Sequence, residues 1–326
     1  MKRVYVCFLI LISLLCLLSC SERAADEKSF FLMDTLVTIK STDVSDEAVW
    51  RCEDRIFEIE AAISRTAEES DVYKFNASES GAELTKDSRA LVTQVLELCE
   101  VLDGAYDPTV ATLCGLWDIT GDARIPSESE ISEALLHTGY AKLTLDGSRL
   151  IKNDAEVKID LGGSGKGYAC KEAVKLLSAT EGYGLVSFGS SIGVFGQKPD
   201  GAGWNIAITD PYEPSSTVGY VTLYDGYISV SGDYERYAEI DGVRYSHLID
   251  PKSGYPLSNG VHSVVIYSKD AVVGDVLSTA LTVAGESAIE KYKSAGIEFE
   301  ALIISDRGYT MTDGMKKILT LYEEKK

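Results

Sequence analysis

Positive charge is scarce in this sequence. Its 326 residues include 31 lysines and arginines against 51 aspartates and glutamates, a formal net charge of -20 at pH 7. A surface this acidic repels nucleic acid and anionic membranes, so neither is expected as the main partner. An anionic small molecule would have to be bound through a local cation or a metal ion.

Paired cysteines are also missing. Of 7 cysteines, four lie beyond the first twenty residues, widely spaced and without a CxxC pair: Cys52, Cys99, Cys114 and Cys170. This spacing does not match a zinc pattern. Cys52 and Cys99 fall on predicted helices at positions where a thiol can simply be part of the core. The sequence therefore predicts neither a disulfide nor a catalytic cysteine.

Long apolar runs are absent except at the N-terminus. There Lys2 and Arg3 precede an apolar run over residues 4–18. The run is short for a membrane-spanning helix and is typical of an export signal. It ends in Leu-Leu-Ser-Cys, which resembles a bacterial lipoprotein box with Cys20 as the lipidated residue. The alternative is a plain secretory signal in which Cys20 is incidental.

These features predict three parts of the chain. Residues 1–19 would be a lipoprotein signal peptide, residues 20–29 a lipid-anchored tether, and residues 30–326 the folded domain. Acyl chains on Cys20, such as palmitate, would hold that domain at a membrane surface. We expect it to face the periplasm or the outer side of the inner membrane.

Apolar residues make up 45% of the chain, enough for a substantial core in one large or two modest domains. Their spacing predicts helices and strands in alternating groups. Helices are predicted over 43–64, 86–102, 127–136 and 271–284. Strands are predicted over 30–40, 141–145, 156–161, 185–195, 204–209, 218–223, 227–230, 262–267, 299–304 and 309–312.

Glycines follow the predicted strand 156–161, in the segment DLGGSGKGY over 160–168, and a helix to about residue 179 comes next. The segment is not a Walker loop, because Gly167 rather than Ser or Thr follows Lys166, and it is not a GxGxxG fingerprint. Glycine still lets backbone N–H groups approach an anion, and a helix start favours negative charge. We interpret it as an anion-binding turn; a purely structural turn is the alternative.

Ionisable and tyrosine side chains crowd the segment 230–256, a mixture that a core strand cannot bury. Such residues usually face a ligand, although an exposed hairpin with a solvated face would have the same composition. The dipeptide Asp241-Gly242 predicts a tight hairpin turn. The second strand then places His247 and Asp250 near a strand end, where catalytic residues are common.

The apolar helix 271–284 carries polar residues on one face. Asp275 and Thr279 are four residues apart and share that face. A carboxylate and a hydroxyl at this spacing form half of an oxygen site suited to magnesium. A polar stripe at the helix surface is the alternative.

Seven motifs occur in order along the chain: MDT at Met33, SRTAEESDVYKFN at Ser64, AYDPTVATL at Ala105, DLGGSGKGY at Asp160, SGDYERY at Ser231, HLIDPKSGYP at His247 and GDVLSTAL at Gly274. In these motifs the chain resembles the ApbE family, whose members are magnesium-dependent FAD:protein FMN transferases. The similarity runs from about residue 30 to residue 321. It implies a two-lobed, T-fold-like α+β fold of mixed sheets and packed helices, with FAD in the cleft between the lobes.

The resemblance also implies site residues. The positions that match the FAD site are Met33, Ala105, Tyr106, Asp107, Asp160 and Lys166, with His247 beside the scissile phosphates. Magnesium would be held by the Asp275 carboxylate, the Thr279 hydroxyl and backbone oxygens at Gly163 and Ser278.

The sequence departs from the family pattern at Thr66, in the segment at Ser187 and at Lys171, where an acid is often found. Thr66 falls where many relatives carry an aromatic residue that stacks on the isoalloxazine ring, a contact worth about 0.5–1.5 kcal/mol. The segment at Ser187 replaces the usual Asn-x-Gly-Gly. Thr66 is still expected in the FAD site, where the missing stack would weaken FAD binding and let water compete as nucleophile.

The implied reaction is FMN transfer. A Ser or Thr hydroxyl of an acceptor attacks the FMN-side phosphorus of FAD and releases AMP. His247 is the candidate to take the proton, with Asp250 or Asp233 orienting it. Family acceptors are flavoproteins such as subunits of membrane redox complexes. Two alternatives are a magnesium-dependent FAD pyrophosphatase, favoured by Thr66, and a periplasmic flavin-binding lipoprotein without catalysis.

Overall fold

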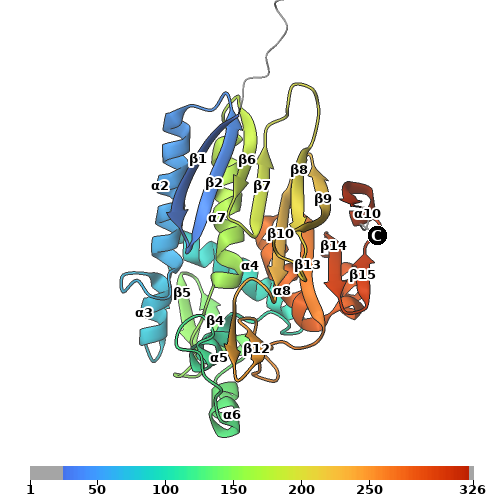
Figure 1. The fold of residues 1–326 in the computed structure, drawn as a ribbon. Coiled ribbons are helices and arrows are strands. Elements are labelled where there is room, and N and C mark those ends of the chain that lie inside the picture. The colour runs from blue at the N-terminus through green and yellow to red at the C-terminus, as the bar shows by residue number, and fades with distance from the viewer. Residues whose placement is uncertain (1–24, 323–326) are drawn as a thin grey trace, which may run out of the picture.

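An antiparallel sheet of eight strands organises the molecule, shown as a computed structural model in Figure 1. The structure describes residues 25–322. The strands pair in the order β1-β2-β6-β7-β10-β13-β14-β15. Their bounds are β1 Asp26–Leu32, β2 Thr35–Thr42, β6 Tyr183–Ser187, β7 Ser191–Phe195, β10 Tyr227–Gly232, β13 Val261–Ser268, β14 Glu300–Ser305 and β15 Gly308–Met311.

Three smaller sheets accompany it, in the orders β16-β9-β8, β3-β5-β4 and β11-β12. Their strands are β3 Gly81–Glu83, β4 Leu143–Asp146, β5 Arg149–Lys152, β8 Trp204–Thr209, β9 Thr217–Leu223, β11 Tyr237–Ile240, β12 Val243–Ser246 and β16 Leu319–Leu321. The helices are α2 Asp46–Ile63, α3 Asp71–Ala77, α4 Lys86–Val101, α5 Ala111–Trp117, α6 Glu128–Leu136, α7 Gly162–Leu177, α8 Ala271–Ala284, α9 Ile289–Ser294 and α10 Met315–Ile318, with short 3-10 turns at Pro108–Val110, Tyr140–Lys142 and Glu286–Ala288.

The middle of the main sheet is buried on both faces. Helices α7 and α8 pack on one face, and the β8-β9-β16 sheet packs on the other. Strand β13 shows why, because Val264 and Ile266 point to the helices while Val265 points to the small sheet, and all three are fully buried. Successive side chains of β13 point to opposite faces of the sheet, and each face packs against its own core. The strand is therefore apolar at consecutive positions in the sequence.

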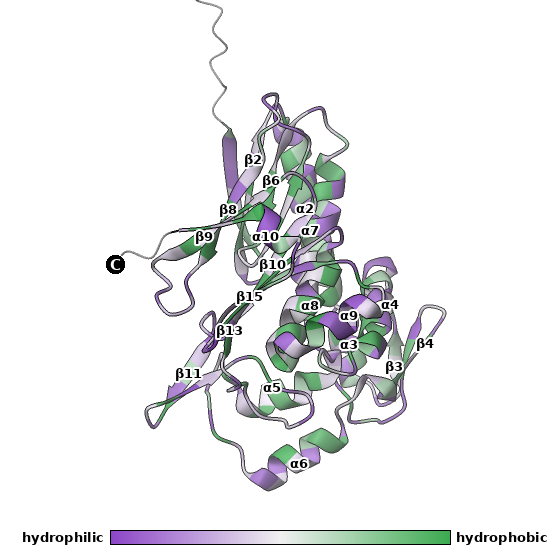
Figure 2. Cartoon of the chain, turned by 90° about the vertical axis from the view of Figure 1, so that its right-hand side faces the viewer, coloured by the Kyte–Doolittle hydropathy of each residue, from purple (hydrophilic) through white to green (hydrophobic). Residues whose placement is uncertain are grey.

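A smaller cluster joins α5 and α6 to the segment after β12. Figure 2 shows α5 beside the β11–β12 hairpin and α6 at the end of the molecule. Trp117 packs there against Tyr245 and Tyr255, and its indole N–H donates to the Gly254 carbonyl at 2.9 Å. This contact fixes the 247–256 segment against a helix.

Several predicted elements are confirmed. Helix α8 has the predicted bounds, and strand β8 spans the predicted 204–209. Ser127 and Glu130 form the capping box at the start of α6. The β11–β12 hairpin turns at Asp241 and Gly242, which both have positive φ. The α+β class is confirmed as well.

The predicted strand 30–40 is wrong, because the chain turns inside it. Leu32 pairs with Thr35 across an antiparallel hairpin. The two residues between them, Met33 and Asp34, have φ of 55° and 56°. Both values belong to the left-handed region of a tight hairpin turn. Because Met occupies the first turn position, no glycine or asparagine marks this turn in the sequence.

Two further predicted strands differ. Residues 185–195 form the hairpin β6–β7 rather than one strand, with Gly189 at φ 75° between them. Residues 156–161 form no strand and have no sheet partners. The side chain of Asn76 takes the place of a neighbouring strand, since it donates to the Ile159 carbonyl at 2.9 Å and accepts from the Ile159 N–H at 2.8 Å.

The predictions for the N-terminus fall largely outside the described residues. These are the signal peptide and the lipidation of Cys20. Strand β1 begins at Asp26, so the last residues of the expected tether belong to the sheet. Within residues 25–322, none of the helices combines the length and the apolar character needed to cross a bilayer.

Candidate functional site

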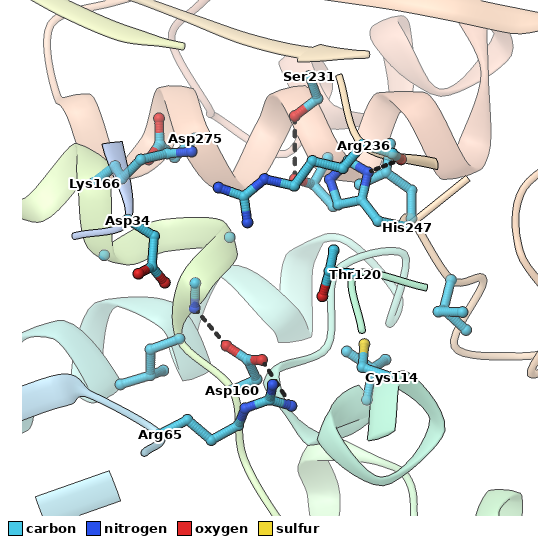
Figure 3. A pocket seen from close by; sticks show the side chains of 18 of the residues that line it. Asp34, Arg65, Cys114, Thr120, Asp160, Lys166, Ser231, Arg236, His247 and Asp275 are labelled. Carbon is cyan, nitrogen blue, oxygen red and sulfur yellow. Dashed lines mark hydrogen bonds and ion pairs between the residues drawn. The ribbon is translucent and has the colours of Figure 1, made fainter. Parts of the chain in front are cut away.

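A cavity of ≈ 410 Å³ lies where α7 and α8 meet the tip of the β1–β2 hairpin. Residues of the segments 230–236 and 247–251 also line it, together with the end of α5. The volume lies in the usual range for small-molecule sites. Figure 3 shows Lys166, Asp275 and Ser231 on one side of this cavity.

Asp275 of α8 is the buried carboxylate of the cavity, with 6% exposure. Its Oδ1 accepts from the hydroxyls of Ser191 and Ser229, each at 2.6 Å, and its Oδ2 accepts from the Gly167 N–H at 2.6 Å. Burial raises the pKa of Asp275 above its ordinary value. The hydrogen bonds and the positive charge of Lys166 act in the opposite direction.

Two glycines allow α8 to come this close. A Cβ on Gly167 of α7 would lie 2.4 Å from the Ala271 carbonyl oxygen and 2.8 Å from Cγ of Asp275. A Cβ on Gly274 would lie 2.8 Å from Oγ of Ser229. Any side chain at either position would push α8 away from α7 or from the sheet, so the glycines serve helix packing.

Hydroxyl groups surround this carboxylate. Ser278 donates to the Asp275 backbone carbonyl at 2.9 Å, and its Oγ lies 2.8 Å from Oγ of Ser231. The Ser231 hydroxyl also lies 3.3 Å from Oγ1 of Thr279. The predicted face of Asp275 and Thr279 therefore points into the cavity together with two serines.

The glycine segment begins a helix directly rather than forming a loop. Helix α7 starts at Gly162, whose N–H donates to Oδ1 of Asp160 at 2.8 Å. The buried Tyr106 ring lies beneath Gly163, where a Cβ would meet it at 3.0 Å. Oδ2 of Asp160 lies 3.5 Å from Nη1 of Arg65. Glycine here permits close packing at the helix start.

His247 lines the cavity near Ser231 and Arg236 (Figure 3). Its Nδ1 lies 2.9 Å from the Arg236 carbonyl oxygen, which can only accept, so Nδ1 carries the proton and Nε2 has a free lone pair. Loss of solvation lowers the pKa of His247 to about 4, and the charges of Arg236 and Lys166 contribute in the same direction. The imidazole is therefore neutral at pH 7.

The expected orienting carboxylates do not contact His247. Asp250 lies outside the cavity lining, and its Oδ1 accepts from the Lys252 N–H at 3.0 Å within the turn. Asp233 instead binds Nδ1 of His262 through Oδ2 at 2.9 Å. The prediction of an acid partner is corrected: the Arg236 backbone carbonyl orients the imidazole.

The remaining predicted residues all line the cavity, but they differ in what their side chains can do. Met33, Thr66 and Ala105 contribute surface. The Asp107 carboxylate is already used, since Oδ1 accepts from the Thr109 N–H and hydroxyl and Oδ2 accepts from the Tyr140 N–H. Asp107 thus holds the cavity floor together rather than facing a ligand.

Sequence reasoning missed several polar residues of the lining. Asp34 comes from the unrecognised hairpin turn, Arg65 from the segment after α2, Ser231 from the end of β10 and Arg236 from the segment after β10. The many charged residues in 230–256 do indicate that this segment, which includes Ser231 and Arg236, faces a ligand. Nothing local marked Asp34, because its turn lacks glycine.

The four cysteines of the described chain are free thiols. Cys114 lines the cavity, whereas Cys52, Cys99 and Cys170 are buried in the core. Burial raises the pKa of all four thiols, that of Cys114 to about 12. A thiol with so high a pKa is a poor nucleophile at neutral pH.

Comparison with known proteins identifies the family that carries this site. Residues 33–303 match the family model described as the ApbE family. The chain belongs to the ApbE family. Among its ApbE relatives is the FAD:protein FMN transferase of Vibrio cholerae, 33% identical over 290 residues, which are 85% of this chain and 86% of the relative. The FAD:protein FMN transferase of Escherichia coli K12 is 32% identical over 248 residues, 72% of this chain and 70% of the relative.

Solved ApbE structures share the fold. The crystal structure of the ApbE protein from Thermotoga maritima superimposes with a TM-score of 0.84 at 33% identity, covering 90% of this chain and 99% of that one. The flavin transferase ApbE from Vibrio cholerae gives 0.78 at 26% identity with the same coverage. The resemblance inferred from the seven motifs is confirmed.

Proposed function

We propose that this ApbE protein transfers FMN from FAD to a Ser or Thr hydroxyl of an acceptor protein and releases AMP. The relatives named FAD:protein FMN transferase support this reaction. The observation that carries it is the pairing of a buried carboxylate, Asp275, with a neutral imidazole, His247, in the lining of one cavity. The first can hold a cation at a phosphate, and the second can accept a proton.

Magnesium is part of the proposal. Among residues 25–322, no three or more His, Cys, Asp or Glu side chains are grouped to hold a metal ion by themselves. The donors present are nevertheless all hard oxygens: the Asp275 carboxylate, the Thr279 hydroxyl and the Ser278 backbone oxygen, which also accepts from the Thr282 hydroxyl at 2.7 Å. One carboxylate with a few neutral oxygens fits a magnesium ion that shares its coordination with substrate phosphates. Bound there, Mg²⁺ would neutralise charge on the pyrophosphate.

The backbone oxygen of Gly163 is a further expected ligand. The regular partner of that carbonyl in an α-helix is the N–H of Gly167, four residues on. That N–H points to Oδ2 of Asp275 at 2.6 Å. Because the Gly167 N–H donates to Asp275, the Gly163 carbonyl oxygen could accept another partner. Gly163 also lines the cavity, which supports this oxygen as a metal ligand.

Cationic side chains bind the substrate phosphates in this proposal. The net charge of -20 opposes an anionic ligand everywhere else on the surface. Lys166, Arg236 and Arg65 line the cavity and provide local positive charge. They would orient the pyrophosphate so that its FMN-side phosphorus faces the acceptor.

His247 removes the proton from the acceptor hydroxyl. Its Nε2 lone pair is free because Nδ1–H is held by the Arg236 carbonyl. The hydroxyl oxygen forms a bond to the FMN-side phosphorus, the phosphorus–oxygen bond to AMP breaks, and AMP takes up the electron pair. The products are a protein phosphoester of FMN and AMP.

Hydrolysis of FAD to FMN and AMP is a second candidate. The observation in its favour is Thr66, an exposed residue of the cavity lining with no ring to stack on a flavin. Water would then replace the acceptor hydroxyl at the same phosphorus. Binding of flavin without chemistry is the third candidate, and the intact Asp275 and His247 argue against it.

The lipoprotein box at Cys20 supports a location at a membrane, facing the periplasm or the outer side of the inner membrane. Acceptors there would be flavoproteins such as subunits of membrane redox complexes. The acidic surface argues against nucleic acid as a partner.

Release of AMP from FAD tests these candidates. The protein without residues 1–20 is incubated with FAD, with Mg²⁺ or EDTA, and with or without an acceptor peptide that contains a Ser or Thr. Mg²⁺-dependent AMP that appears only with acceptor, together with flavin fluorescence on the peptide, is the expected result. AMP without acceptor would establish hydrolysis, and no AMP in any sample would overturn both reactions.

A further inference from the structure

Two serines from neighbouring strands hold the carboxylate of Asp275. Ser191 on β7 and Ser229 on β10 are directly opposite each other in the antiparallel ladder. Residues opposite each other in such a pair point to the same face of the sheet, here toward α8. Both hydroxyls lie 2.6 Å from a single atom, Oδ1 of Asp275, and both serines are 1% exposed.

These bonds leave the carboxylate with little freedom. An ionised carboxylate offers about four lone-pair sites, two on each oxygen. The two serine hydroxyls occupy Oδ1, and the Gly167 N–H occupies one site on Oδ2 at 2.6 Å. One lone pair of Oδ2 therefore remains for a ligand in the cavity, which Asp275 lines.

We propose that Ser191 and Ser229 are positioning residues, which direct Oδ2 of Asp275 toward a single divalent cation in the cavity. The inference rests on the proposed function, because that cation is the Mg²⁺ expected with FAD. Neither serine lies on α8 or lines the cavity. They act only through the carboxylate that they hold.

Removal of both hydroxyls would free Oδ1. The terminal torsion of an aspartate is soft, so the carboxylate could then rotate and share its oxygens differently between Gly167 and the cavity. Groups that hydrogen-bond a metal-ligating carboxylate typically change metal affinity by about 10- to 100-fold when they are lost. We expect a loss of that size for the double substitution and a smaller one for each single substitution.

A purely structural role for the serines makes a different prediction. If they only satisfied a buried charge, their loss would lower the unfolding temperature, while the folded protein would bind metal and FAD as before. If the serines position Asp275, loss of their hydroxyls lowers the affinity for metal and leaves the affinity for FAD in EDTA unchanged. The ratio of these two affinities separates the roles.

The test measures Mn²⁺ binding to the protein without FAD, by calorimetry and by the loss of the free Mn²⁺ EPR signal. Mn²⁺ prefers the same oxygen ligands as Mg²⁺ and can be detected directly. The variants are S191A, S229A and their combination, with S229T as a conservative variant that keeps a hydroxyl. S263A is the matched control, because Ser263 is a buried serine of β13 that does not line the cavity.

The expected result is about 10- to 100-fold weaker Mn²⁺ binding for the double variant, near-normal binding for S229T and S263A, and unchanged FAD affinity in EDTA for all. Folded double or single alanine variants that bind Mn²⁺ as tightly as wild type would overturn the proposal. If the double variant does not fold, Mn²⁺ binding by the two single alanine variants tests the proposal. Absence of Mn²⁺ binding by the wild type would instead overturn the metal site of the proposed function.

Discussion

Two parts of the cavity lining are built in opposite ways: a buried wall around Asp275 and an exposed wall around Arg236 and His247. On one wall Asp275 is buried between two helices and a sheet and accepts three hydrogen bonds from fixed groups. On the other wall Arg236 is exposed, and His247 is held by the Arg236 backbone carbonyl, in a segment next to a two-stranded hairpin. The group with the most constrained geometry thus comes from the core, and the more accessible groups come from a surface segment.

The same contrast appears between two histidines. Desolvation lowers the pKa of His247 to about 4, and no carboxylate among the described residues contacts its ring. His262 lies on β13 with a carboxylate on each ring nitrogen, Asp233 on Nδ1 and Asp306 on Nε2, both at 2.9 Å. Burial lowers the pKa of His262, but these two bonds outweigh it and raise the pKa above the ordinary value. The first imidazole is neutral at pH 7 with a free Nε2, and the second joins two loops through its carboxylate partners.

Replacement of Asp275 by alanine tests the buried wall and should have the largest effect. It removes the only carboxylate among the proposed ligands, and cation stabilisation of a phosphoryl transition state is worth several kcal/mol, so AMP release should fall at least about 1,000-fold. The measurement is single-turnover AMP release from FAD with Mg²⁺. Asp225, which pairs with Lys269 away from the cavity, is the control position. Retention of Mg²⁺-dependent activity in D275A would contradict the assignment.

Replacement of His247 by asparagine tests the exposed wall. Asparagine can still donate to the Arg236 carbonyl but offers no base, so the rate should fall about 100-fold or more. In the wild type a pKa of about 4 keeps the imidazole neutral, so its protonation should not reduce the rate between pH 6 and 8. Rates measured from pH 4 to pH 8 check this. An acid limb near pH 6.5 that disappears in H247N would show that the pKa of His247 is not lowered.

Substitution of Gly167 by alanine tests how closely α7 and α8 pack in the buried wall. The new Cβ would lie 2.4 Å from the Ala271 carbonyl oxygen. Overpacking of this kind costs about 1–3 kcal/mol, which urea denaturation measures. Gly115 in α5 has nothing within 4 Å of an added Cβ, so G115A should be neutral or slightly stabilising. Equal stability of the two variants would mean that the helices separate easily.

Substitution of Arg236 by glutamine removes charge from the exposed wall but keeps the backbone carbonyl that holds His247. Charge-assisted bonds to phosphate contribute about 1.5 kcal/mol at the low end, so the KM for FAD should rise about 10-fold with kcat nearly unchanged. Arg244 is the matched control, since it stacks on Tyr237 and does not line the cavity. A loss in kcat at constant KM would place Arg236 in the transition state instead.

The smallest effect is expected for His262→Asn. Because the folded pKa of His262 is raised, its stabilisation is fully present below the unfolded pKa, about 6.5, and is lost as pH rises through the folded value. Pairs of this kind contribute about 0.2–1 kcal/mol, and Asp306 is largely exposed. Urea denaturation at pH 6 and pH 9 should show wild type more stable than H262N only at the lower pH. The other groups facing the ring are Asp233 and Tyr212. An equal difference at both pH values would contradict the ionised pairing.

The sequence by itself determined the elements whose signals are local. The apolar period predicts α8 with its observed bounds, the Ser127–Glu130 spacing predicts a capping box, and Asp241-Gly242 predicts a hairpin turn. The spacing of Asp275 and Thr279 predicts one shared helix face, and both residues line the cavity. In each case the interacting residues are close to one another along the chain, so the feature can be predicted from the sequence without knowledge of the tertiary structure.

Only the tertiary structure decided how the site is held. Ser191 and Ser229 reach Asp275 from strands 84 and 46 residues away, and the carbonyl that orients His247 lies 11 residues before it. The hairpin turn at Met33 was not predicted because no turn residue marks its first position. Hydrogen bonds between distant segments depend on how helices and sheets pack, and packing distance is set by groups such as Gly167 whose role appears only when the opposite surface is in place.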